Sequence, residues 1–290
     1  MNKLMNPADV VANLKDGMTI GIGGWGPRRK PMALIRAILN SDVKDLTVVS
    51  YGGADVGMLC AAGKVKKLIF AFVSLDFMPL EPYFRQARQA GSLEVMEVDE
   101  GMLLHGLRAA AWGCPFIPTA VGLGTDVIRH NDIEVISSPY DNKDWVAMPA
   151  IKLDMALVHV NKADARGVCQ INAQDCFMDE WFVRAADKAF VSCEEVVDSE
   201  YFYDPAQANK VLWERNCTTG VIHIPGGAHP SSCQPEYGFD VDHFKAYAKT
   251  AKEGGFQAYA EQYVLNRSED EYQAIVGGLE HIQSLPQPVY

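Results

Sequence analysis

The sequence predicts an α/β fold: an open, mostly parallel sheet with helices on both faces. Short apolar segments rich in valine and isoleucine alternate with stretches whose apolar residues recur at helical spacing. The connections between these segments are short, and several contain glycine. Strands separated by helices pair in parallel, because each crossover returns the chain to the same edge of the sheet.

The first part of the chain shows this alternation without interruption. The predicted strands are Met18–Gly23, Leu46–Tyr51, Leu68–Val73 and Leu93–Val98. The predicted helices are Ala8–Leu14, Met32–Leu39 with Pro31 in its first turn, a short helix from Asp55, Glu81–Ala90 and Met102–Trp112.

The pattern is less regular between Cys114 and Pro149, where proline, glycine, Asp and Asn interrupt it and only Glu134–Ser137 is typical of an extended segment. Such a segment inside an α/β fold often carries function. Regularity then resumes, with strands at Met155–Val160, Ala189–Ser192 and Gly220–Ile224 and a helix at Trp181–Ala186.

The tail from Val241 to Gly278 is predicted to be helical, with aromatic side chains that pack on the core. The sequence contains no repeat, low-complexity tract or linker. We therefore expect a single domain over residues 1–290, with a helical C-terminal extension over about 240–290.

The composition is that of a globular protein, with 48% apolar and 22% charged residues. A net charge of -11 argues against a nucleic-acid partner, which needs a basic surface. No apolar run has the length of a membrane span, and Met1–Pro7 has no apolar signal-peptide core, so we expect no membrane partner. Seven scattered cysteines without a C-x-x-C pair are typical of a reducing compartment. We expect a cytoplasmic protein.

Two acids, Asp99 and Glu100, stand between the apolar strand ending at Val98 and the next helix. Carboxylates at the carboxyl end of a strand lie where open α/β sheets bind ligands. The positive end of the helix dipole also keeps a carboxylate ionised, as a nucleophile or general base requires. The alternative is structural, with Asp99 as the helix cap and Glu100 opposite the dipole. The turn alone does not decide between the two.

A glycine-rich loop, Gly21-Ile22-Gly23-Gly24-Trp25-Gly26, follows the first predicted strand and matches the dinucleotide pattern G-x-G-x-x-G. Two features argue against a dinucleotide. The helix begins only near Pro31, and the next strand ends in Ser50-Tyr51 without the acid that would hold a ribose. The glycines still allow a ligand to approach closely, and free amides there would bind an oxyanion.

Arg28, Arg29 and Lys30 follow this loop and suit a phosphate or a carboxylate, unless they form only a solvated basic turn. His229 lies in a second glycine-bearing loop, Gly226–Cys233. It is either an acid–base or hydrogen-bonding group of a site or a structural residue. The His and Cys spacing of metal sites is absent from the sequence, so we expect no metal.

These pieces, in this order, resemble the α subunit of class I coenzyme A transferases from about Gly17 to about Cys233. The segments that carry the resemblance are GMTIGIGGWG (17–26), AGKVKKLI (62–69), GSLEVMEV (91–98), PFIP (115–118), GLGT (122–125), residues 154–164 and AADK (185–188). GGAHPS (226–231) is similar to glutaconate-type α subunits. GWGPRRKP (24–31) and VDEGM (98–102) are most similar to the α subunit of the IpdAB-type hydrolases, which open a ring in steroid degradation.

The resemblance implies an open α/β sheet and a β-subunit partner of similar fold, in a heterotetramer of two α and two β chains. In the transferases a β-subunit glutamate within a Ser-Glu-Asn-Gly-like motif forms the covalent intermediate, and this sequence has no such motif. In the IpdAB-type hydrolases that nucleophile is absent, and the α-subunit glutamate that matches Glu100 is catalytic. Asp99 then remains the cap.

The implied reaction is hydrolysis of a carbon–carbon bond in a cyclic keto-enoyl-CoA that bears a propionate side chain. Coenzyme A is part of the substrate, and no separate cofactor is expected. The implied substrate-binding residues are Gly23, Gly24, Trp25, Arg28, Arg29, Lys30 and His229. The amides of Gly23 and Gly24 would stabilise an oxyanion, and one of the three cations would hold the propionate carboxylate or a coenzyme A phosphate.

Two other functions remain open. The chain is alternatively the α subunit of a glutaconate-type acyl-CoA transferase, whose nucleophilic glutamate belongs to the β subunit. A third possibility is a non-catalytic partner that only supplies a coenzyme A pocket.

Overall fold

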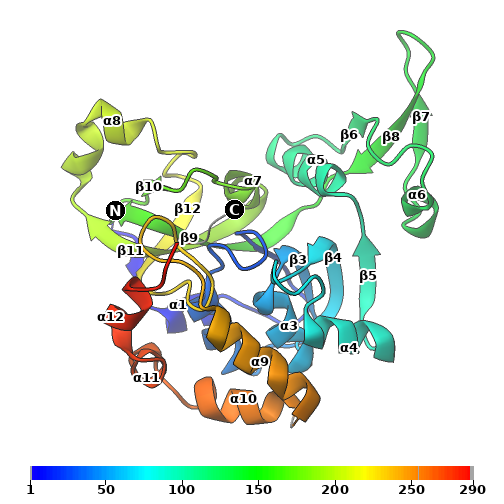
Figure 1. Ribbon diagram of the computed structural model, residues 1–290. Helices are drawn as coiled ribbons and strands as arrows, with labels where there is room; N and C mark the ends of the chain where they lie inside the picture. Colours follow the sequence, from blue (N-terminus) through cyan, green and yellow to red (C-terminus); the bar gives the residue numbers. More distant parts are fainter. Residues whose placement is uncertain (1, 254, 288–290) are drawn as a thin grey trace.

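The computed structural model describes residues 2–253 and 255–287 and has the predicted architecture, a mostly parallel sheet between two layers of helices (Figure 1). The main sheet contains, in spatial order, β1 (Leu4–Met5), β12 (Thr218–His223), β11 (Ala186–Val197), β9 (Leu153–Asp164), β2 (Thr19–Ile22), β3 (Leu46–Gly52), β4 (Val65–Val73) and β5 (Glu94–Glu97), all in parallel pairs. β10 (Cys169–Gln170) adds to β9 in antiparallel orientation.

Helices cover both faces of this sheet because its strands are apolar on both sides. In β3, Val48 packs into one core and its neighbour Val49 into the other. The helices on the Val48 face include α1 (Pro7–Val11), α2 (Met32–Leu39), α3 (Ala54–Ala61), α4 (Pro82–Ala90), α9 (Val241–Glu253) and α10 (Gly255–Tyr263). Those on the Val49 face include α5 (Glu100–Ala111) and α7 (Asp179–Arg184).

The segment from Cys114 to Pro149 is more ordered than the sequence pattern indicates. It forms a three-stranded antiparallel sheet of β6 (Phe116–Thr119), β8 (Asp144–Pro149) and β7 (Val135–Ser137), with α6 (Asp126–His130) between β6 and β7. Val146 and Met148 of β8 pack into the same core as α5. The loop that joins β7 to β8 projects away from the rest of the molecule (Figure 1).

The C-terminal tail is helical, as predicted, and continues from α10 into α11 (Glu269–Ile275) and α12 (Gly278–Gln283). Its aromatic residues Phe244, Tyr247 and Tyr259 are buried against α2, α3 and α4, which confirms that they pack on the core. A 3-10 turn (Ser199–Tyr203) and α8 (Pro205–Ala208) complete the described elements. No helix within residues 2–253 and 255–287 is long and apolar enough to cross a membrane.

The order of the strands predicts where a ligand binds. From β2 the sheet grows in one direction through β3, β4 and β5, and from β9 it grows in the other through β11 and β12. The boundary between β2 and β9 is a topological switch point, and open α/β sheets bind ligands beside the carboxyl ends of the strands there. The glycine-rich loop that begins at Gly23 leaves β2 at this position.

A buried carboxylate positions helix α4. Glu81 is the N-cap of α4 and accepts hydrogen bonds from the amide of Phe84 (2.6 Å) and the hydroxyl of Tyr247 (2.8 Å). A Cβ atom added to Gly57 of α3 would lie 2.1 Å from the Glu81 carboxyl carbon, so only glycine allows α3 to approach this closely. Burial raises the pKa of Glu81 to about 7.

Replacing Glu81 with Gln will remove part of the pH dependence of stability. Between pH 4.5 and about 7 the folded chain keeps a proton that the unfolded chain has lost, so the stability decreases as the pH rises through this range. We expect this decrease to be smaller in Glu81→Gln by about 3 kcal/mol, measured by urea unfolding at several pH values. Glu94→Gln, which alters an exposed carboxylate of β5, should retain the wild-type slope, and equal slopes for wild type and Glu81→Gln would refute the assignment.

Candidate active site

The glycine-rich loop after β2 folds back on itself. Trp25 and Arg28 exchange backbone hydrogen bonds of 2.9 Å in both directions. Gly24, with a φ of +75°, lies at the closest approach, where an added Cβ atom would be 2.5 Å from the backbone oxygen of Arg28. Backbone atoms cannot move aside as a flexible side chain can, so this position requires glycine.

A buried aspartate holds this loop. Asp179 of α7 accepts a hydrogen bond from the Gly24 amide at 2.7 Å, and its other oxygen lies 3.0 Å from the Arg29 guanidinium. The Gly23 amide donates to the backbone oxygen of Leu157 at 2.9 Å. Both amides that we expected at an oxyanion therefore have partners inside the chain, and we do not assign that role to them.

The three consecutive cations point to different places. Arg29 is 2% exposed and bound to Asp179, and Lys30 is fully buried with its Nζ atom 3.2 Å from Asp55. Burial lowers the pKa of Lys30. Arg28 forms an ion pair of 2.5 Å with Asp76. The structure therefore does not bring these cations together into one anion-binding patch.

Trp25 connects the glycine loop to the acidic turn. Its ring stacks on Tyr51 at the end of β3, with ring centroids 4.9 Å apart, and it also contacts Phe72 and Phe177. The Tyr51 hydroxyl donates to the backbone oxygen of Glu100 at 2.8 Å. The two motifs that the sequence singled out are thus joined through one buried tyrosine.

The structure separates the roles of the two acids. Asp99 is the N-cap of α5, and its carboxylate accepts a hydrogen bond from the Gly101 amide at 2.8 Å, as the capping interpretation requires. Glu100 is the first residue of the helix. Desolvation, and then the charge of Asp99, raise the pKa of Glu100. A glutamate with a raised pKa is better matched to proton transfer near neutral pH.

Glu100 opens onto a hollow of about 780 Å³, which we call the acidic hollow. It has the volume of a typical ligand site. Its lining consists of Ala71, Arg88, Val95, Glu97, Val98, Asp99, Glu100, Asp126, Val127, His130 and Asn131. Four of these residues are carboxylates, and Arg88 is the only arginine or lysine among them.

Comparison with known proteins identifies the family. The model of the coenzyme A transferase family matches residues 4–211, more than half of the chain. The chain belongs to the coenzyme A transferase family.

Two relatives within this family differ in what they do. The chain is 45% identical to the cholesterol ring-cleaving hydrolase IpdA subunit of Rhodococcus jostii, over 95% of this chain and 96% of the relative. It is 29% identical to one subunit of the glutaconate CoA-transferase of Acidaminococcus fermentans, over 94% and 91%. The crystal structure of glutaconate coenzyme A-transferase from that organism superposes with a TM-score of 0.91, at 27% identity, over 98% of this chain and 95% of that chain.

In this coenzyme A transferase family chain, His229 is fully buried and does not line the acidic hollow. Its ring nitrogens lie 2.7 Å from the Tyr272 hydroxyl of α11 and 3.1 Å from the carboxylate of Asp240. Burial lowers its pKa. These contacts tie the second glycine-bearing loop to the C-terminal helices, and substrate binding by His229 stays a prediction.

Three potential metal ligands that are distant in sequence, His159, Glu194 and Cys233, lie with their ligand atoms within 4.8 Å of one another. His159 has hydrogen-bond partners at both nitrogens, Ser192 at 2.8 Å and Glu194 at 2.7 Å. Glu194 also accepts from the Gly226 amide at 2.7 Å. This buried network fastens the loop after β12 to β9 and β11, which linear spacing along the chain did not indicate.

Sequence reasoning missed several residues that shape the site. Asp179 stands in the first turn of a short helix, which is a common place for a surface acid, so its burial against Arg29 could not be inferred from the sequence. Tyr51 enters the sequence argument only as a residue that is not an acid. Arg88 and His130 reach the acidic hollow from α4 and α6, and no motif surrounds either of them.

Replacing Asp179 with Ala will test what holds the glycine loop. The change leaves the Arg29 charge buried without its partner, so we expect a loss of about 3–5 kcal/mol in the free energy of unfolding, measured with urea. Asp187→Ala removes an exposed carboxylate just after α7 ends and should change stability by less than about 0.5 kcal/mol. A loss below about 1 kcal/mol in Asp179→Ala would contradict this role.

Proposed function

We propose that this chain is the α subunit of a cytoplasmic, heteromeric hydrolase that opens the last ring of a steroid by hydrolysis of a carbon–carbon bond. The substrate is a cyclic keto-enoyl-CoA with a propionate side chain, and the complex contains two α and two β chains. Glu100 is the general base. The 45% identity to a cholesterol ring-cleaving hydrolase subunit supports the reaction, and that relative's description as a subunit supports a partner chain.

The observation that carries the proposal is the position of Glu100. Its carboxyl group faces a hollow of about 780 Å³ at the carboxyl end of a parallel strand, with a pKa raised by desolvation and by Asp99. Asp99 already caps α5, so Glu100 is not needed for that purpose. Tyr51 fixes the backbone of Glu100, which restricts the positions that its carboxylate can adopt.

The chemistry requires one water molecule and one base. Glu100 takes a proton from water, and the hydroxide oxygen attacks the ring ketone. The bond between this carbon and the carbon next to the thioester then breaks, and its electron pair becomes the thioester enolate. A proton delivered to the enolate carbon completes the reaction, with a new carboxylate at one end and an intact thioester at the other.

A second candidate function is acyl-CoA transfer, which the TM-score of 0.91 to glutaconate coenzyme A-transferase supports. The two functions differ in the partner chain. A transferase forms a covalent thioester on a partner glutamate, which hydroxylamine converts to a hydroxamate detectable by mass spectrometry. Detection of this adduct during turnover would refute the hydrolase proposal, whereas ring opening without an adduct would support it.

Replacing Glu100 with Gln removes the base and keeps the shape of the side chain. We expect kcat for ring opening in the reconstituted complex to fall by about 10²–10⁴-fold. Glu94→Gln, on β5 but outside the acidic hollow, should retain the wild-type rate. Near-normal turnover by Glu100→Gln would favour a non-catalytic role for this chain.

The raised pKa of Glu100 also predicts the pH profile. Only the ionised carboxylate accepts a proton, so activity is lost as the pH falls through this pKa. We expect the acidic limb of kcat/KM, measured from about pH 4 to about pH 8, to lie above the range of an ordinary glutamate. This limb should be absent from the residual activity of Glu100→Gln, and its persistence there would assign it to another group.

A further inference from the structure

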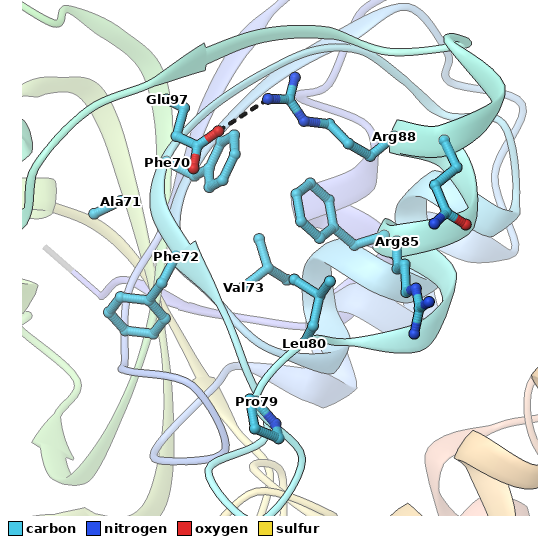
Figure 2. A pocket seen from close by; sticks show the side chains of 11 residues that line it. Phe70, Ala71, Phe72, Val73, Pro79, Leu80, Arg85, Arg88 and Glu97 are labelled. Atoms are coloured by element: carbon cyan, nitrogen blue, oxygen red, sulfur yellow. Dashed lines mark hydrogen bonds and ion pairs between the residues drawn. The ribbon is translucent and has the colours of Figure 1, made fainter. Parts of the chain in front are cut away.

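A second hollow lies between β4 and α4 and has a volume of about 320 Å³ (Figure 2). We call it the α4 hollow; its lining includes Phe70, Phe72, Val73, Leu80, Phe84 and Arg88. Phe70 and Phe84 pack edge to face, with ring centroids 5.1 Å apart. Leu80 at the rim is 45% exposed. This surface suits an apolar ligand that covers the rim leucine and contacts the rings.

The α4 hollow adjoins the acidic hollow. Ala71, Arg88 and Glu97 line both, so a ligand that extends from one to the other passes these residues. Figure 2 shows Arg88 reaching from α4 toward Glu97 of β5, beside Phe70. Their ion pair, at 2.9 Å, therefore stands at the boundary between the apolar hollow and the hollow that contains Glu100.

This ion pair is exchangeable. The side chains of Arg88 and Glu97 are 43% and 55% exposed, and pairs this exposed are worth about 0–1 kcal/mol. Arg88 donates one hydrogen bond to Glu97, whereas a guanidinium can hold a carboxylate with two. A carboxylate on a bound ligand can therefore replace Glu97 at small cost.

The other candidate cations are committed elsewhere. Arg29 and Lys30 are buried in ion pairs with Asp179 and Asp55, and Arg28 is paired with Asp76 and lines neither hollow. Breaking a buried pair leaves an uncompensated charge and is costly. Exposure and position thus distinguish Arg88 from the three cations that the sequence suggested.

We propose that the α4 hollow binds an apolar part of the substrate that bears a carboxylate, and that Arg88 releases Glu97 to bind this carboxylate. The reacting carbonyl then lies in the acidic hollow beside Glu100. The inference rests on the proposed function for the identity of the ligand as the ring and propionate of a coenzyme A ester. Arg88 is accordingly a specificity residue that selects substrates with a second carboxylate.

The test uses the full chain, in complex with its partner chain, and a probe that needs no turnover, 3-cyclohexylpropanoate. The primary amide of this probe is the neutral control of the same shape. Dissociation constants of both compounds are measured by calorimetry for wild type, Arg88→Ala, Arg88→Lys and Glu97→Gln. Glu94→Gln, an exposed carboxylate on the same strand outside both hollows, serves as the control for Glu97→Gln.

We expect Arg88→Ala to weaken binding of the carboxylate at least about tenfold and to leave binding of the amide within about threefold. Arg88→Lys should fall between wild type and Arg88→Ala, since it keeps the charge but not the planar fork. Glu97→Gln should tighten carboxylate binding about two- to fivefold, because it removes the competing partner. The two halves of one ion pair thus act in opposite directions.

A purely structural ion pair would give the same sign for both variants, and that result would overturn the proposal. Equal losses for carboxylate and amide, or no binding of the carboxylate to the wild-type complex, would also overturn it. The outcome is independent of catalysis, because Glu100→Gln should bind the probe normally. Failure of the ring-opening proposal therefore shows in the Glu100 kinetics, and failure of this one shows in the Arg88 binding data.

Discussion

The carboxylate of Asp179 holds together the part of the molecule on which the candidate site depends. It accepts the Gly24 amide with one oxygen and binds the Arg29 guanidinium with the other, and all of this lies out of contact with water. A buried arginine is tolerated only with such a partner. The loop fixed in this way places Trp25 on Tyr51, and Tyr51 in turn holds the backbone of Glu100. The acidic turn is thus connected to the centre of the sheet.

Burial sorts the charges of the chain into two classes. Arg29 and Lys30 are enclosed with Asp179 and Asp55, where exchange of a partner would strand a charge in a medium of low polarity. Arg88 and Glu97 remain in contact with solvent, which solvates each of them when they separate. The first class maintains the geometry of the loop, and the second remains available for binding. An apolar neighbour such as Phe70 makes the exposed pair useful, because it supplies affinity without competing for the charge.

Sequence patterns predicted the elements up to Ala111 well, because apolar periodicity there spans whole strands and helices. They failed where strands are short or contain polar residues. β6, β7 and β8 carry prolines or too few residues for a clear period, and β6 pairs with β8 across a long loop. β9 and β11 extend past their predicted ends because polar residues such as Asn161 and Glu194 continue them, each satisfied by buried partners. A single sequence does not reveal such partners.

By itself, the sequence determined the fold class, the cap at Asp99, the position of Glu100 at the start of a helix, and the helical tail. These features depend on local preference and periodicity, which neighbouring residues carry. Only the tertiary structure decided which cations are buried, that the Gly23 and Gly24 amides are occupied, and that Arg88 borders the hollow of Glu100. The reason is distance along the chain: Asp179 stands 155 residues from Gly24 and 150 from Arg29. Pairing and burial over such separations follow from folding and leave no mark in the local sequence.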